Sequence, residues 1–335
     1  MDRRETRLVS LVAFPGVQVL NLAGPMEMLR GAWSAVRSLR PGAYTEPPYK
    51  TRIVARERGP VVSSCGLAVV ADDAFASAPT DLDTLVVAGG EVDNALADGA
   101  LMDFVRSAAA RSKRVVALGA GTFILAKAGL LEGRRATTHW RHCETLAKAH
   151  PGIRVEPDLV FVKDGNVYTC AGIAAAMDLA ATLIEEDIGR DVALAVARDK
   201  VMWMKRPGDE PQVSAQLAAQ SVSHPQLAPL LEWLLRTPGE DVSVERMAER
   251  AAMSERTLTR LFQRELGTSP AKFVEHARVE MARRLLEESN LRLDAIARRC
   301  GFGSEERMRR TFHRVFGVSP RDYHRRIQGG EAAIS

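Results

Sequence analysis

The sequence predicts two different folds in one chain: an α/β domain built on a parallel sheet, followed by an all-α domain with two helix-turn-helix units. Three observations lead to this prediction. Strand-like and helical segments alternate over the first two hundred residues, the last hundred residues contain the same pattern twice, and a stretch rich in proline and glycine separates the two regions. At 335 residues, the chain is long enough for two or three domains.

The first region alternates between strand and helix signals. Short apolar runs that end in small residues predict strands at 8–14, 49–55, 84–90, 114–121 and 167–172. Helical spacing or composition predicts helices at 25–39, 95–110, 122–128 and 174–186. Continuously apolar strands with intervening helices are typical of a parallel sheet covered on both faces. Two further runs, 154–156 and 159–162, are expected to pair as a hairpin at an edge.

Three glycine-containing turns follow predicted strands. They are Phe14–Gly16, Ala88–Gly90 and Gly119–Gly121. In a parallel sheet, ligands bind beyond the carboxyl ends of the strands. The third turn leads directly into a helix, so its free N–H groups are placed to receive an anion or a polar ligand. Each turn alone is better explained as a tight connection, but three converging turns favour a pocket.

The C-terminal region repeats a unit of short helix, small-residue turn and second helix. Residues 242–273 match residues 291–323, with an offset of 49 in the first helix and 50 in the second. Two such units in tandem predict two helix-turn-helix elements, and therefore double-stranded DNA as the partner. The alternative is an accidental repeat in a solvated helical domain. The shared small turn residues and Gly-x-Ser-Pro endings count against it.

Each unit has an inward and an outward face. Ser254 and Ser304 are expected to cap the second helices, and Gly301 to form the second tight turn. One amphipathic helix, 270–288, would hold the two units apart, so that they enter successive major grooves about 34 Å apart. The side chains expected to face DNA are Arg256, Thr259, Arg260, Glu306, Arg307 and Arg310.

Charge is unevenly distributed along the chain. The net charge is +4, and from His224 onward 20 Lys and Arg stand against 16 Asp and Glu, so the whole excess lies in the repeated region. Residues 292–326 contain ten arginines, whose planar guanidinium can contact a guanine edge or a phosphate. Some of these arginines form an ordinary solvated face. Arg325 and Arg326 are better placed for phosphates than for bases.

The cysteines and the hydropathy pattern exclude several classes. Cys65, Cys143, Cys170 and Cys300 share no close spacing, which argues against a zinc site or a disulfide framework. Cys300 is expected to be a small core residue. We find no signal peptide, and the apolar runs are too short to span a membrane. We expect a cytoplasmic protein, on the nucleoid when bound to DNA, with no metal and no cofactor.

The region between the two folds is expected to be a linker. Arg206–Pro211 and His224–Pro225 interrupt the helical pattern, and the polar residues between them fit one short helix. We therefore expect an α/β domain at 1–205, a linker at 206–224, a DNA-binding domain at 225–328 and a disordered tail at 329–335.

The repeated region resembles the AraC/XylS family of bacterial transcription regulators. The matching segments are Met253–Pro270, Ile296–Phe302 and Arg310–Arg325, and the resemblance extends from about residue 225 to residue 327. It implies sequence-specific DNA binding, with base-contacting residues at the helix positions named above.

The first region resembles the PfpI-like, class I glutamine amidotransferase-like domain, which has a flavodoxin-like parallel sheet sandwich. The matching segments are Phe14–Leu29, Val86–Gly90, Leu118–Trp140 and Thr169–Ala180. Together with the repeated region, this is typical of the GlxA-type (AdpA-like) branch of the AraC/XylS family. We expect this domain to serve in dimerisation, in sensing a small metabolite, or in both.

The departures from this pattern bear on catalysis. Enzymes of the PfpI-like superfamily carry a cysteine at the strand-to-helix elbow, where this chain has Gly119, which offers no nucleophile. Asn21 replaces a usual Asp, and Cys170 replaces a usual Ser. His139 and Trp140 match the family's Thr-His-Trp motif and either line a pocket or pack as a structural pair. The expected pocket residues are Asn21, Gly89, Gly90, Gly119, Ala120, His139 and Cys170.

These features predict a regulator that binds promoter or operator DNA, is not an enzyme, and forms a homodimer through its first domain. The alternative is an active hydrolase or amidase fused to a DNA-binding domain. A first domain that only dimerises is a third reading that the sequence leaves open.

Overall fold

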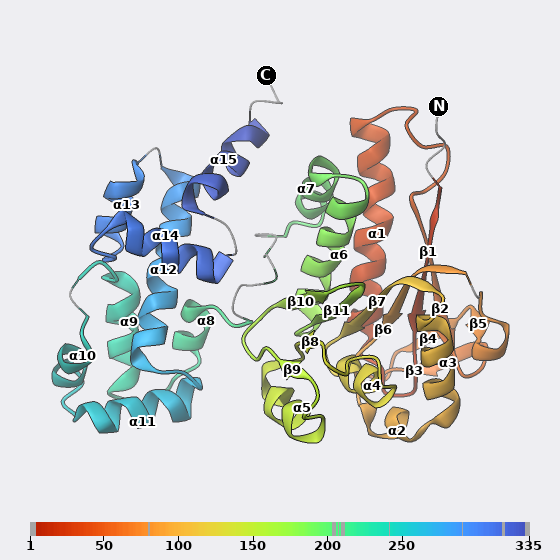
Figure 1. Cartoon of the computed structure of the whole chain (residues 1–335), viewed down its shortest axis with the longest axis horizontal. Helices are drawn as coiled ribbons and strands as arrows, with labels where there is room; N and C mark the ends of the chain where they lie inside the picture. The colour runs from red at the N-terminus through yellow and green to blue at the C-terminus, as the bar shows by residue number, and fades with distance from the viewer. Residues whose placement is uncertain are drawn as a thin grey trace. The chain divides into compact units, whose positions relative to one another are not determined.

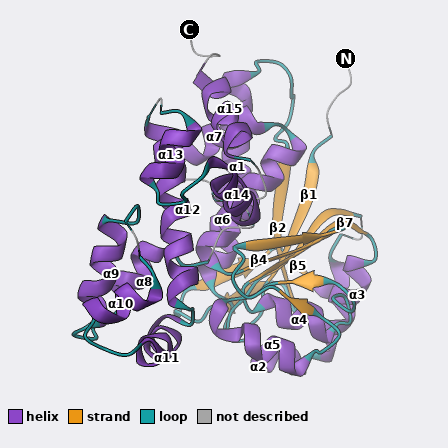
Figure 2. Ribbon diagram, turned by 60° about the vertical axis from the view of Figure 1, so that its left-hand side comes forward, coloured by secondary structure: helices purple, strands orange, loops and turns teal. Residues whose placement is uncertain are grey.

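The chain folds into two compact units, Met1–Gln212 and Val213–Ser335. The computed structural model describes residues 5–79, 81–202, 206, 208, 212–240, 242–289, 291–316 and 319–331. Within these residues, no helix combines the length and the apolar character that a membrane span requires. Figure 1 shows the elements of both units, and Figure 2 distinguishes helices from strands.

A seven-stranded sheet forms the centre of the first unit, in the order β10-β11-β7-β6-β1-β2-β5. Its strands are β1 (Arg7–Val12), β2 (Tyr49–Ala55), β5 (Asp73–Ala74), β6 (Leu82–Val87), β7 (Ser112–Leu118), β10 (Phe161–Asp164) and β11 (Val167–Cys170). All neighbouring pairs are parallel except β10 with β11. The predicted α/β class with a mostly parallel sheet is confirmed.

Helices cover both faces of this sheet. On one face α1 (Val19–Leu39), α6 (Ile173–Asp187) and α7 (Arg190–Asp199) pack together, and α2 (Val92–Ala97), α3 (Gly99–Ala109) and α4 (Gly121–Lys127) lie on the other (Figure 1). The inner strands are buried on both sides, which explains their continuous apolar runs. The shorter elements are β3 (Gly59–Val62), β4 (Ala68–Ala71), η1 (Phe75–Ser77), β8 (Arg135–Ala136), η2 (Trp140–His142), α5 (Cys143–Ala149) and β9 (Arg154–Val155).

The predicted hairpin between 154–156 and 159–162 is wrong. β9 pairs in parallel with β8, whereas β10 forms the hairpin with β11. The reason is the turn Gly165–Asn166 between β10 and β11, where Gly165 has a φ of 62°. A two-residue turn with glycine at positive φ matches the twist of an antiparallel pair, and the earlier segment has no such turn.

The second unit is helical. Its elements are α8 (Ala215–Gln220), α9 (Leu227–Arg236), α10 (Val244–Arg250), α11 (Glu255–Leu266), α12 (Pro270–Glu288), α13 (Leu293–Arg299), α14 (Glu305–Phe316) and α15 (Pro320–Glu331). α12 has the predicted bounds and belongs to two separate cores. Its first half packs with α8–α11 through Phe273 and Ala277, and its second half packs with α13 and α14 through Ala282 and Leu286.

The sequence repeat is also a repeat in packing. Phe262 meets Phe273 edge to face at 5.8 Å, and Phe312 meets Tyr323 in the same way at 5.4 Å. These four aromatic residues occupy matching positions of the two copies. Each helix-turn-helix unit therefore closes its core with the same aromatic pair.

The segment expected to link the units is largely packed. Arg206 and Gln212 are bonded to the α/β unit, while Ala215 and Val222 are buried in the core of the helical unit. The expected tail begins inside α15, which ends at Glu331; residues 332–335 lie outside the described part of the chain.

Candidate ligand site and nucleic-acid interface

Four neighbouring strands, β11, β7, β6 and β1, bring their carboxyl ends to one edge of the sheet. The turn after β7 is the elbow. Gly119 has a φ of 53°, its N–H donates to Cys170 O (3.0 Å), and its carbonyl accepts from Thr138 Oγ1 (2.8 Å). A Cβ on Gly119 would meet its nearest atoms, Ala171 O and Gly172 Cα, at 3.5 Å. The elbow thus keeps a left-handed backbone and room for a side chain that glycine lacks.

Gly89 and Gly90 have a different reason to be glycine. A Cβ on Gly89 would lie 2.5 Å from Leu118 O and 3.0 Å from Ala120 N. A Cβ on Gly90 would collide with Gly16 O. These two glycines let the turn after β6 contact the neighbouring turns backbone to backbone, so packing explains them without a ligand. The same packing brings Ala120, at the start of α4, beside Gly89.

Asn21 lies on α1 against this edge and is fully buried. Its Nδ2 donates to Gln18 Oε1 (2.8 Å) and lies 3.1 Å from where a Cβ of Gly89 would be. Within the part of the chain that the structure describes, its Oδ1 has no hydrogen-bond partner. A buried carbonyl oxygen without a donor is costly, so this amide is an unused acceptor at the edge of the candidate site.

His139 reaches the elbow from the loop before η2. Its Cδ2 lies 3.8 Å from where a Cβ of Gly172 would be, and Gly172 borders Gly119. The ring stacks on Trp140 at a centroid distance of 5.5 Å. Burial, together with His142 and Arg141, lowers the pKa of His139, which favours a neutral imidazole. His139 is half-buried, so the ring has one packed side and one side open to solvent.

Cys170 ends β11 and is fully buried. Burial raises the pKa of its thiol to about 12, although backbone hydrogen bonds with Gly119 and Gly172 act in the opposite direction; its Sγ donates to Gly172 O at 3.8 Å. The thiolate is the reactive form of cysteine, and it is not populated here at neutral pH. Cys170 therefore lies at the carboxyl end of β11, hydrogen-bonded to Gly119 through its backbone carbonyl, with its thiol protonated.

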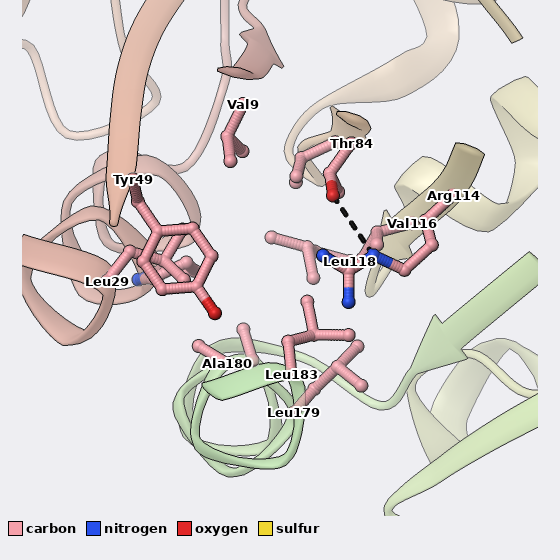
Figure 3. Close-up of a pocket in the computed structure, with 13 residues that line it drawn as sticks. Val9, Leu29, Tyr49, Thr84, Arg114, Val116, Leu118, Leu179, Ala180 and Leu183 are labelled. Atoms are coloured by element: carbon pink, nitrogen blue, oxygen red, sulfur yellow. Dashed lines mark hydrogen bonds between the residues drawn. The ribbon is translucent and has the colours of Figure 1, made fainter. Parts of the chain in front are cut away.

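A cavity of about 20 Å³ lies elsewhere, between the sheet and helices α1 and α6 (Figure 3). Leu29, Leu118 and Leu183 are among its lining residues, and at one side Arg114 Nε donates to Thr84 Oγ1 (3.2 Å). It has room for about one water molecule, so it is no effector site. Among the described residues, no three His, Cys, Asp or Glu side chains gather as metal ligands.

Two polar residues at the site escaped the sequence-based prediction. Arg206 forms an ion pair with the buried Asp178 of α6 (2.8 Å), and the side chain of Gln212 bonds to the loop that carries Trp140. Both residues lie in the segment that was expected to be a linker. The composition of this segment gave no signal, because Asp178 lies 28 residues from Arg206 in sequence and Thr138 lies 74 residues from Gln212.

The first helix-turn-helix unit consists of α10 and α11. Ser254 caps α11 by accepting from Thr257 N (3.2 Å), as predicted. Leu258 and Phe262 point inward, while Arg256, Thr259 and Arg260 are exposed.

The second unit consists of α13 and α14, with Ser304 accepting from Arg307 N (3.2 Å) and Gly301 in the turn at a φ of 74°. Glu306, Arg307 and Arg310 are exposed, and the carboxylate of Glu306 accepts two hydrogen bonds from Arg309 (2.8 and 2.9 Å). This pairing lowers the pKa of Glu306. Each carboxylate oxygen of Glu306 thus accepts one hydrogen bond from Arg309 and keeps a further lone pair for a base amine.

Comparison with known protein families gives two matches. The DJ-1/PfpI family matches residues 7–186, and a helix-turn-helix domain matches residues 247–326. The two matches correspond to the α/β unit and to the double helix-turn-helix region.

Individual relatives are similar to this chain over different lengths. The HTH-type transcriptional regulator GlxA of Rhizobium meliloti is 30% identical over 325 residues, which cover 97% of this chain and 98% of the relative. An isonitrile hydratase of Pseudomonas putida is 36% identical over 191 residues, covering 56% of this chain and 75% of that enzyme. A crystal structure of a THiJ/PfpI family protein from Pseudomonas syringae aligns with a TM-score of 0.53 at 25% identity, over 69% of this chain and 87% of that one.

Proposed function

We propose a division of roles within this chain, which belongs to the DJ-1/PfpI family and is a transcriptional regulator with a helix-turn-helix DNA-binding domain. The helical unit reads a specific operator. The α/β unit is a non-catalytic sensor of a small polar molecule and joins two chains into a dimer. The observation that carries the non-catalytic assignment is the elbow, which has the backbone and the space for a nucleophile but carries only Gly119.

The proposal for DNA reading rests on the exposed faces of α11 and α14. Arg260 and Arg310 stand on the second helix of each unit, which is the helix that enters the major groove in this motif. A bidentate contact from arginine to guanine contributes about 1–3 kcal/mol of discrimination.

The test begins with genome-wide mapping of bound DNA, followed by footprinting of the strongest site. Arg260→Ala and Arg310→Ala should each lose affinity for that site but little for a scrambled duplex at the same salt concentration. The control is Arg236→Ala. Arg236 is an exposed arginine of α9, which belongs to neither helix-turn-helix unit. An equal loss of affinity for the specific and the scrambled duplex would show that these arginines contact the DNA backbone and not the bases.

The proposal for the α/β unit predicts no hydrolase, deglycase or amidotransferase turnover by the purified protein. The site would instead bind a metabolite that raises the melting temperature, and His139→Ala should weaken that binding. A ligand whose binding is unchanged in His139→Ala would move the site away from the elbow.

An enzymatic function is the second candidate, because an isonitrile hydratase shares the fold at 36% identity. Cys170 is the cysteine whose carbonyl accepts from the N–H of Gly119 at the elbow (3.0 Å). The pKa of its thiol, about 12, argues against Cys170 as a nucleophile. Labelling with an electrophile separates the two candidates. Slow, ligand-independent labelling of Cys170 fits a sensor, whereas rapid labelling that a ligand blocks would favour the enzyme.

A further inference from the structure

The side chain of Gln212 is held as a ligand would be. Its Oε1 accepts from Trp140 N (2.8 Å). Its Nε2 faces four oxygens, namely Thr138 O (2.8 Å), Leu159 O (3.1 Å), Pro157 O (3.2 Å) and Thr137 Oγ1 (3.2 Å). We call these five groups the carboxamide cradle. They come from the loop before η2 and from the segment that leads to β10.

The cradle is selective for a primary carboxamide. Turning the amide over would set its oxygen against three carbonyls and its NH₂ against the N–H of Trp140, so only one orientation satisfies both edges. An ammonium group would satisfy the carbonyls but leave Trp140 N–H without an acceptor. A carboxylate has no N–H for the four oxygens. An N,N-dialkylated amide has none either, and it is too wide.

The cradle shares a wall with the elbow. Thr138 gives its carbonyl to Gln212, and its hydroxyl donates to Gly119 O (2.8 Å). Arg206, six residues before Gln212, makes a second contact with the α/β unit. Its backbone N–H and its guanidinium bind the buried Asp178 (2.8–2.9 Å). Thr138 therefore connects the two sites: if a ligand moves Gly119 at the elbow, the shift is passed to Gln212 through this one residue.

Gln212 is also close in sequence to the DNA-binding unit. Only Val213 separates it from Ser214, which caps α8 by accepting from Leu217 N (3.1 Å). Helix α8 packs in the core of that unit through Ala215, whose N–H donates to Glu280 Oε1 (3.1 Å). One residue of chain therefore separates Gln212 from the residue that caps the first helix of the helical unit.

We propose that Gln212 is an intramolecular ligand of the carboxamide cradle, and that a small molecule with a primary carboxamide displaces it and releases the chain leading to α8. The effect of this release on DNA binding rests on the proposed function. The cradle itself does not depend on it.

Hydrogen exchange of the full-length chain tests the cradle, with propionamide as the probe. Gln212→Ala should speed exchange of the Trp140 amide about 2- to 10-fold, the range that one hydrogen bond sustains. Propionamide should restore slow exchange in this variant, and N,N-dimethylpropionamide and propionate should not. Gln216→Ala, an exposed glutamine of α8, is the matched control and should exchange as the unaltered protein does.

A second variant guards against a folding defect. Gln212→Glu keeps the length of the side chain but places a carboxylate against the cradle oxygens, so it should speed exchange at Trp140 as Gln212→Ala does. The cradle proposal is overturned if the Trp140 amide exchanges at an unchanged rate in both variants. It is also overturned if propionamide and its dimethyl analogue slow that exchange equally in Gln212→Ala.

Operator affinity separates the two proposals. On the footprinted site, Gln212→Ala should change affinity by at least about fivefold relative to Gln216→Ala, the lower range of measured couplings between sites. If Gln212→Ala speeds exchange of the Trp140 amide but leaves operator affinity unchanged, the cradle proposal is retained and its link to DNA binding is overturned. If the unaltered protein selects no site in the genome, the proposed function fails, and the exchange result still decides the cradle.

Discussion

The two helix-turn-helix turns place matching residues, Ala252 and Gly301, in the left-handed region of backbone conformation. Their φ angles are 51° and 74°. Ala252 is exposed, so its Cβ points to water, whereas a Cβ on Gly301 would lie 2.7 Å from Pro238 O. The same turn therefore tolerates a side chain in the first copy and excludes one in the second.

Gly301→Ala should destabilise the helical unit by more than about 1–2 kcal/mol, because the left-handed strain and the clash with Pro238 add. The reverse exchange, Ala252→Gly, relieves strain but loosens the unfolded chain, and should change stability by less than about 1 kcal/mol. Calorimetry of the two variants checks this. If the loss in Gly301→Ala were no larger than the strain that Ala252→Gly relieves, the backbone angle alone would set the cost and the contact with Pro238 would contribute nothing.

A second pair of glycines distinguishes packing from strain at the candidate site. Gly89→Ala should destabilise the α/β unit by about 3 kcal/mol or more, because its Cβ would sit 2.5 Å from Leu118 O. Gly119→Ala meets only ordinary contacts at 3.5 Å and should cost about 1–2 kcal/mol for its positive φ. Thermal unfolding of both variants is the measurement, and a larger loss at Gly119 would contradict our view of the elbow.

For single residues, the sequence predicted those roles that depend on near neighbours in the chain. The caps Ser254 and Ser304 and the buried Cys300 could be read from neighbours within a few positions. The close backbone approach at Gly89 and the placement of Gln212 could not, because both depend on partners brought from other elements.

Among the elements, α12 has the most demanding position, because one helix supplies side chains to both helical cores. Between these two groups of apolar residues stands Glu280, whose carboxylate accepts from the N–H of Ala215 in α8 (3.1 Å). Burial raises the pKa of Glu280, even though this hydrogen bond and Arg283 and Arg284 act in the opposite direction.

Glu280 should make the stability of the helical unit depend on pH. Its folded pKa lies above its unfolded one, so its contribution is present at low pH and is lost as the pH rises and the buried carboxyl must ionise. Glu280→Gln cannot ionise and still accepts from Ala215. It should therefore unfold at a higher temperature than the unaltered chain near pH 7, and the difference should shrink near pH 4. Glu288→Gln, exposed on the same helix, should give no such trend.

Element boundaries were predictable where a cap or repeat fixed them. The bounds of α12 were correct because Ser269 caps it and Pro270 begins it. The first helix was predicted to begin at Pro25, yet α1 begins six residues earlier at Val19 and contains Pro25 in its interior. Tertiary packing of α1 on α6 and α7 overrides the local proline signal there.

For the molecule as a whole, the charge asymmetry marks the helical unit as the one that meets nucleic acid. The net charge of +4 lies wholly from His224 onward. Arg325, which follows the second copy of the repeat, is exposed and is paired with Asp322 at 3.4 Å. Such a side chain can exchange its partner for a phosphate. The side chain of Arg326 lies outside the described part of the structure.

Arg325→Ala should weaken binding to specific and scrambled duplexes alike, because phosphate contacts carry no sequence information. The slope of log affinity against log salt concentration should fall in magnitude by about 1. Titrations at several salt concentrations provide the slope, with Arg236→Ala as the control. A loss confined to the specific duplex would instead place Arg325 among the base-reading residues.

The cores of the two helix-turn-helix units exclude every side chain that we expect to read DNA. Arg256, Thr259 and Arg260 are exposed on α11, and Glu306, Arg307 and Arg310 are exposed on α14. Substitutions on these faces should therefore leave folding intact, while α12 continues to join the two helix-turn-helix units. On the expectation that these six side chains read DNA, such a regulator would acquire new operators through surface substitutions, and its regulon would change faster than its architecture.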